Sequence, residues 1–127
     1  PNVAAQAAAT LLMKYPDLAG IACVEAAGGA GAAMAVREAG LAGKVKIISM
    51  DRGNDVLQEI EAGVISASVA QQTALMPFYA TQILYNLYNY DIPISTDNAK
   101  AGITGTPNVI DTGVVIVDET NYQYFMR

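Results

Sequence analysis

The sequence contains no histidine, which excludes several kinds of active site at once. Ser-His-Asp and Cys-His nucleophile systems need an imidazole to accept a proton, and the commonest zinc sites use histidine as a ligand. Cys23, which lies within an apolar run, is the single cysteine. Because a disulfide needs two cysteines, none can form inside the chain, and cysteine usage does not indicate whether the protein works in an oxidising or a reducing compartment. We therefore expect no enzyme, with no catalytic residues, metal or cofactor.

Positive charge is also scarce. Seven Lys and Arg against twelve Asp and Glu give a formal net charge of −5. Because the cations are scattered rather than clustered, we expect this segment to bind no nucleic acid. No apolar run approaches the roughly 18 to 20 residues that cross a bilayer. No secretory leader opens the chain, which begins abruptly at Pro1 beside a predicted helix, so we expect a piece of a longer protein.

Apolar runs alternate with helical patterns, which predicts an α/β fold with a doubly wound parallel sheet. We expect strands at about residues 19–24, 44–50, 65–70 and 113–117. We expect helices at about residues 3–15, 28–39, 54–61 and 75–88, and a loop at about 91–107. The apolar residues of 44–50 predict a strand buried on both faces. In 65–70, Ile65, Ala67 and Val69 alternate with Ser66 and Ser68.

Three successive predicted strands end in polar side chains. Glu25 follows the first strand, Asp51 the second, and Gln71 and Gln72 the third. Ligands of parallel sheets bind just outside the carboxyl ends of the strands, so these positions converge on one rim. Each also has a simpler interpretation, since Asp51 can cap a turn and the two glutamines can be solvated strand ends.

The glycine-rich stretch after Glu25 invites a nucleotide interpretation. Gly29 and Gly31 precede Asp51 by the spacing of a dinucleotide-binding fingerprint. The third glycine position, however, is Met34, and Glu25 places a carboxylate where a phosphate would approach the helix. We favour close packing of the helix on the sheet as the reason for the glycines. A dinucleotide-binding enzyme domain ranks third among the functions considered.

Four segments in order carry a resemblance: LLMKYPDLAGIACVEA, GAAMAVREAGLAGKVKIISMD, LQEIEAGVISASVAQQ and VIDTGVVIVDETN. Over about residues 3–117 the chain resembles type I periplasmic binding proteins, in the branch typified by ribose-binding protein. The resemblance implies a two-lobed sugar-type solute receptor that closes by hinge motion and serves an ABC permease or a membrane sensor. It also implies a periplasmic or extracellular location, with lipoprotein anchoring as one form of it.

By this resemblance, residues 1–127 form an incomplete C-terminal lobe. Residues 73–107 would cross to the N-terminal lobe, and 108–127 would return as a strand and tail. The crossing helix would then expose an apolar face, so we expect the chain by itself to associate with a second copy. The main alternative function is the effector domain of a sugar-responsive transcription regulator, which shares this fold. The segments ASVAQQ and VIDTGVVIVDETN favour the transport receptor.

The resemblance also assigns ligand contacts. The family residues aligned with Asp51 and Gln71 are an aspartate that binds ligand hydroxyls and a glutamine near the hinge. The residue aligned with Glu25 is commonly asparagine, so Glu25 departs from the pattern and leaves an amine-bearing or differently hydroxylated ligand open. Arg52 and Gln72 would flank the site. A carboxylate that accepts from two hydroxyls, beside a glutamine that donates and accepts, suits a polyol.

Overall fold

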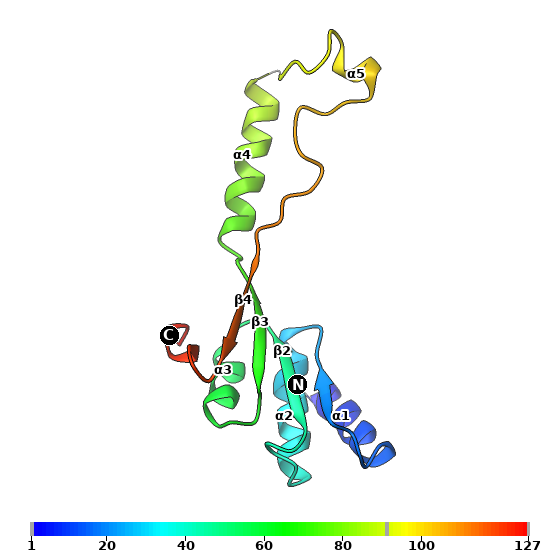
Figure 1. Ribbon diagram of the computed structural model, residues 1–127, viewed down its shortest axis with the longest axis vertical. Helices are drawn as coiled ribbons and strands as arrows, with labels where there is room; N and C mark the ends of the chain where they lie inside the picture. Colours follow the sequence, from blue (N-terminus) through cyan, green and yellow to red (C-terminus); the bar gives the residue numbers. More distant parts are fainter. Residues whose placement is uncertain (1, 91, 127) are drawn as a thin grey trace. The chain divides into compact units, whose positions relative to one another are not determined.

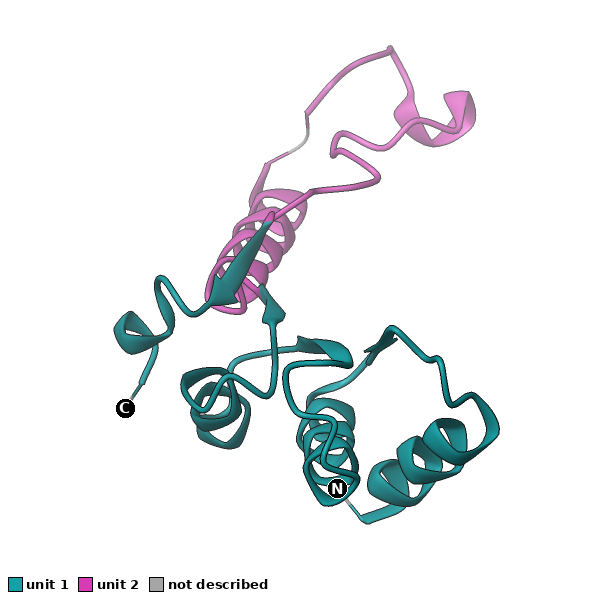
Figure 2. Cartoon of the chain, turned by 60° about the horizontal axis from the view of Figure 1, so that its bottom comes forward, with its two compact units in different colours: residues 1–70, 114–127 teal, residues 71–113 magenta. Residues whose placement is uncertain are grey.

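The computed structural model describes residues 2–90 and 92–126. It divides into two compact units (Figure 2). Residues 1–70 and 114–127 form the first, here called the sheet unit, and residues 71–113 form the second, here called the helical unit. The sequence places the crossing at about residue 73 and the return at about 108, whereas the helical unit begins at residue 71 and ends at residue 113.

The sheet has four strands in the order β1-β2-β3-β4 (Figure 1). They are β1 (Gly20–Ala22), β2 (Lys46–Met50), β3 (Ala67–Gln71) and β4 (Val114–Asp118). β1 pairs with β2, and β2 with β3, both in parallel. The α/β fold with a parallel sheet is confirmed, because helices connect these strands as the alternating sequence pattern predicts.

Three helices belong to the sheet unit: α1 (Asn2–Lys14), α2 (Ala26–Glu38) and α3 (Asn54–Glu61). α1 packs against α2, and α2 packs against both β2 and α3. α2 ends where predicted, because Gly40 adopts a left-handed backbone (φ 68°) just after its last turn. α2 begins two residues earlier than the sequence pattern indicates, at Ala26 rather than Gly28.

The core lies on one face of the sheet. Ile47, on β2, is fully buried between the strands and the helices, whereas its neighbour Ile48 is 40% exposed. The expectation that residues 44–50 are buried on both faces is therefore wrong for the part of the chain that the structure describes. β4 shows the same contrast, with Val117 fully buried and Ile116 half exposed. The core also includes Val36, Val56, Leu57, Ile60, Ile65 and Ala70.

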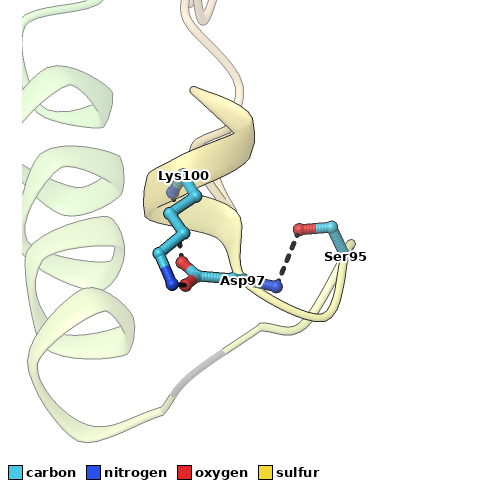
Figure 3. A network of polar contacts seen from close by, with 3 residues as sticks. All are labelled: Ser95, Asp97 and Lys100. Carbon is cyan, nitrogen blue, oxygen red and sulfur yellow. Dashed lines mark hydrogen bonds and ion pairs between the residues drawn. The ribbon is translucent and has the colours of Figure 1, made fainter.

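The helical unit contains α4 (Leu75–Asn89) and the short α5 (Asn98–Ala101). α5 lies within the segment predicted as a loop, and its formation follows from local capping. Asp97 accepts a hydrogen bond from the backbone N–H of Lys100 and forms an ion pair with its Nζ at 3.1 Å (Figure 3). The backbone N–H of Asp97 in turn donates to Ser95 Oγ.

A 3-10 helix, η1 (Tyr122–Tyr124), follows β4 in the sequence and packs against α3. The phenolic hydroxyl of Tyr122 donates a hydrogen bond to Glu61 Oε1 of α3 at 3.3 Å. Across the described residues, no helix combines the length and the apolar character that a bilayer span requires.

Candidate functional site

Glu25 stands between the end of β1 and the start of α2. It is the N-cap residue of α2, with an extended backbone (φ −150°, ψ 162°), yet its side chain makes no capping hydrogen bond. The side chain is exposed. Because the N-terminus of a helix carries partial positive charge, this position stabilises a carboxylate. The Glu25 carboxyl group thus offers acceptor oxygens that the helix cap does not use.

Asp51 directly follows β2 and has an unusual backbone. Its φ of 66° is the single positive value among the non-glycine residues that the structure describes. Its N–H donates to the Val69 carbonyl at 2.9 Å, and its own carbonyl accepts a hydrogen bond from Ser68 Oγ. A non-glycine residue in this region costs about 1–3 kcal/mol, and such strain persists where the surroundings hold it and where function uses it.

The register of β1 and β2 places Glu25 and Asp51 at equivalent positions beyond the two strands. Ala22 of β1 lies opposite Ile48 of β2, and Glu25 and Asp51 each lie three residues beyond that pair. The N–H of Cys23 donates to the Ile48 carbonyl, so the pairing continues one residue past β1. Because the strands are parallel, the structure brings Glu25 and Asp51 to the same edge of the sheet.

Gln71 and Gln72 occupy the point where the sheet unit meets the next segment of chain. Gln71 is the last residue of β3 and the first residue of the helical unit, and its side chain is half-buried. Gln72 lies against the backbone of Gly113, where an added Cβ would stand 2.9 Å from Gln72 Nε2. Gln71 ends a strand, as predicted, while Gln72 is engaged with the returning chain.

The structure gives Arg52 a partner that sequence reasoning missed. Its guanidinium lies over the Phe125 ring, 5.7 Å from the ring centroid, which is the geometry of a cation–π interaction. The turn that carries Asp51 is thereby connected to the C-terminal segment that follows η1. Nothing in the sequence pairs these two residues, because a contact across 73 positions leaves no local pattern.

The glycines of α2 serve packing. A Cβ at Gly29 would stand 1.9 Å from Ser49 Oγ, and one at Gly28 would stand 3.0 Å from the Cβ of Cys23. α2 therefore approaches β2 more closely than any side chain at position 29 permits. The close-packing interpretation is confirmed at Gly29, and Gly31 is also buried in α2.

The side chains at this edge of the sheet can hydrogen-bond a polar ligand. Burial raises the pKa of the half-buried Cys23 thiol, which disfavours the nucleophilic thiolate. Within residues 2–90 and 92–126, no group of three or more Cys, Asp or Glu gathers to hold a metal ion. Glu25 and Asp51 supply carboxylate acceptors, and a glutamine amide can both donate and accept.

Comparison with known proteins gives concordant results. A sequence model of the periplasmic binding protein domain matches residues 1–91. AraP, an arabinose-binding protein from Geobacillus stearothermophilus, is 34% identical with a TM-score of 0.83 over 99% of this chain and 42% of its own. The sugar-binding protein of a Bacillus halodurans sugar ABC transporter is 35% identical, with a TM-score of 0.83 over 96% of this chain and 42% of its own.

A third solved structure, an Agrobacterium vitis ABC transporter solute-binding protein bound with α-D-tagatopyranose, is 25% identical. Its TM-score is 0.76, and the match covers 98% of this chain and 39% of that one. This chain therefore spans about two fifths of the length of the structures it resembles. No curated protein sequence matches it.

Proposed function

Because the chain belongs to the periplasmic binding protein family, we propose that it forms part of the ligand-binding lobe of a sugar-type solute receptor. One observation carries the proposal: two acids, Glu25 and Asp51, stand at the same offset beyond paired parallel strands. Asp51 is also held in a strained backbone, which is typical of a functional position. The arabinose-binding and sugar-binding proteins among the similar structures support the ligand class.

Each residue has a proposed role. The Asp51 and Glu25 carboxylates accept hydrogen bonds from ligand hydroxyls, and the Gln71 amide both donates and accepts. Arg52 and Gln72 flank these contacts, Arg52 from its stacked position on Phe125. Because an ionised glutamate cannot donate, Glu25 selects a ligand that presents donors on that side.

The test is titration calorimetry of the intact polypeptide that contains this chain, with arabinose, ribose and tagatose as probes. Asp51→Asn removes the charge but tolerates the left-handed backbone. Loss of charge-assisted hydrogen bonds costs about 1–3 kcal/mol, or about a 5- to 150-fold weaker Kd. Asp17→Asn is the matched control, since Asp17 is an exposed acid in the loop before β1, at the opposite end of the strands. Equal affinity of Asp51→Asn and wild type removes Asp51 from the site.

The proposed setting follows from the same resemblance. A receptor of this kind acts in the periplasm or outside the cell, anchored in some forms as a lipoprotein, and delivers its sugar to an ABC permease or a membrane sensor. The Bacillus halodurans protein, described as the sugar-binding component of an ABC transporter, supports the permease. Co-purification with a permease from detergent-solubilised membranes, increased by the bound sugar, is the corresponding measurement.

Residues 71–113 have a separate proposed role. In the intact receptor, residues 73–107 belong with the N-terminal lobe, and 108–127 return to the C-terminal lobe. In the chain taken alone, α4 has no buried residue and no charged one, and Leu84 and Leu87 are 67% and 53% exposed. Because two uncharged apolar helices do not repel each other, a second copy of α4 is the partner we propose for this face.

A further inference from the structure

The left-handed backbone of Asp51 must be held by its neighbours, because an isolated aspartate disfavours it. The structure shows two hydrogen bonds that hold it, one to the backbone N–H of Asp51 and one to its backbone carbonyl. The Asp51 N–H donates to the Val69 carbonyl, and the Asp51 carbonyl accepts from Ser68 Oγ. Both partners lie on β3, the neighbouring strand, so hydrogen bonds to β3 fix the backbone conformation of Asp51.

Ser68 is unusual for a serine because its exposure is 0%. A buried hydroxyl that loses its hydrogen-bond partner is destabilising, so the Ser68 hydroxyl and the Asp51 carbonyl depend on each other. Ser49 offers an internal comparison. It lies opposite Ser68 in the register and is 1% exposed, yet its hydroxyl makes only a long 3.4 Å contact with the adjacent Met50 carbonyl.

We propose that Ser68 is a positioning residue for ligand binding: its buried hydroxyl holds the Asp51 carbonyl and thereby keeps Asp51 left-handed. The inference rests on the proposed function, in which the Asp51 carboxylate contacts the ligand. The direction of a Cα–Cβ bond follows from the backbone dihedrals, so a change in φ redirects the carboxylate. Without the Ser68 hydroxyl, only a fraction of molecules present Asp51 correctly, and the apparent Kd rises by the inverse of that fraction.

The test compares Ser68→Ala with Ser49→Ala in the intact polypeptide. Each variant removes one buried hydroxyl from the same layer of the core, but only Ser68→Ala removes the bond to Asp51. We expect Ser68→Ala to weaken arabinose, ribose or tagatose binding about three- to tenfold, with Ser49→Ala within twofold of wild type. Ser68→Thr retains the hydroxyl and restores the affinity.

A second measurement needs no ligand. Hydrogen exchange of the Asp51 amide is compared with that of the Ser66 amide, which bonds to Ile47 within the same sheet. We expect Ser68→Ala to accelerate exchange at Asp51 at least threefold more than at Ser66, whereas Ser49→Ala changes the two amides equally. If Ser68→Ala does not fold, Ser68→Cys, which has a somewhat larger side chain and a weaker donor, replaces it in both measurements.

The outcomes separate the two proposals. If no sugar binds the wild type, the proposed function fails, while exchange at Asp51 still decides whether Ser68 holds the turn. If a sugar binds wild type and Ser68→Ala equally, and the Asp51 amide stays protected, Ser68 is not a positioning residue and the receptor function stands. Equal weakening by Ser68→Ala and Ser49→Ala also overturns the inference, because it reflects general loosening of the core.

Discussion

Gly29→Ala tests whether α2 approaches β2 as closely as the structure shows. The added Cβ would stand 1.9 Å from Ser49 Oγ and 2.6 Å from Ser49 Cβ, far inside van der Waals contact. Ser49 is 1% exposed, so its side chain has no solvent into which it can turn. Overpacking of a core costs about 1–3 kcal/mol, and we expect the upper end here. The gain of about 1 kcal/mol in helix propensity offsets part of it. The net destabilisation is therefore about 2 kcal/mol.

A double-mutant cycle isolates the contact. Ser49→Gly removes both clashing atoms, after which the nearest neighbour of the new Cβ is Ile65 Cδ1 at 3.6 Å, an ordinary contact. In that background Gly29→Ala should be neutral or stabilising by up to about 1 kcal/mol. The coupling free energy between the two positions is then about 2–3 kcal/mol.

The assay is urea unfolding of the four proteins, followed by far-UV circular dichroism because the sequence has no tryptophan. A shift of the midpoint at constant m-value reports a change in the free energy of unfolding. Additive effects of Gly29→Ala and Ser49→Gly would refute the reasoning, since they would show that position 29 and Ser49 do not touch. A stabilised Gly29→Ala would refute it too.

Three further predictions concern other parts of the chain. The hydrogen bond from the Lys100 N–H, and then the Lys100 side chain, lower the pKa of Asp97 from its usual 3.8. Because the folded pKa is the lower one, Asp97 stabilises α5 above about pH 3.8, and this is lost as pH falls through the folded pKa. The protection of the Lys100 amide, measured as its exchange rate relative to an unstructured peptide at the same pH, should thus fall in acid, and Asp97→Asn should abolish that pH dependence. Since burial raises the pKa of Cys23, Ellman's reagent at pH 8 should react much more slowly with folded than with urea-unfolded protein, and equal rates would contradict the burial. The isolated chain should scatter light as a dimer or larger at micromolar concentration, and Leu84→Glu should shift it toward the monomer; a monomeric wild type would count against association through α4.

Local sequence patterns predicted helices α1 to α4, the four strands and the polar residues that follow the strands, but not α5 or η1. Glu25, Asp51 and Gln71 were identified because each follows an apolar run, and strand ends are where parallel sheets present polar groups. The left-handed Gly40 was predicted for a similar reason, since glycine after a helical pattern marks a helix end. These signals depend only on residues close together in the chain.

The features that the sequence did not reveal depend on contacts between distant residues. Ser68 lies in an alternating segment, and nothing in that alternation predicts that it is fully buried. The burial of Ser68 is tolerated because the Asp51 carbonyl accepts a hydrogen bond from its hydroxyl, and that partner lies 17 positions away. Ile48 is apolar yet 40% exposed, contrary to the expectation for residues 44–50, because composition alone does not tell which face of the sheet the helices cover.

The sequence by itself determined that this chain is an α/β domain of the periplasmic binding protein family with acids at its strand ends. Periodicity and residue type act locally, and so both could be recognised without coordinates. Only the tertiary structure decided how those acids are held: the left-handed turn at Asp51, its bonds to β3, and the stacking of Arg52 on Phe125. Each arises where separate segments meet, because hydrogen bonding and burial depend on distance in space rather than on distance along the chain.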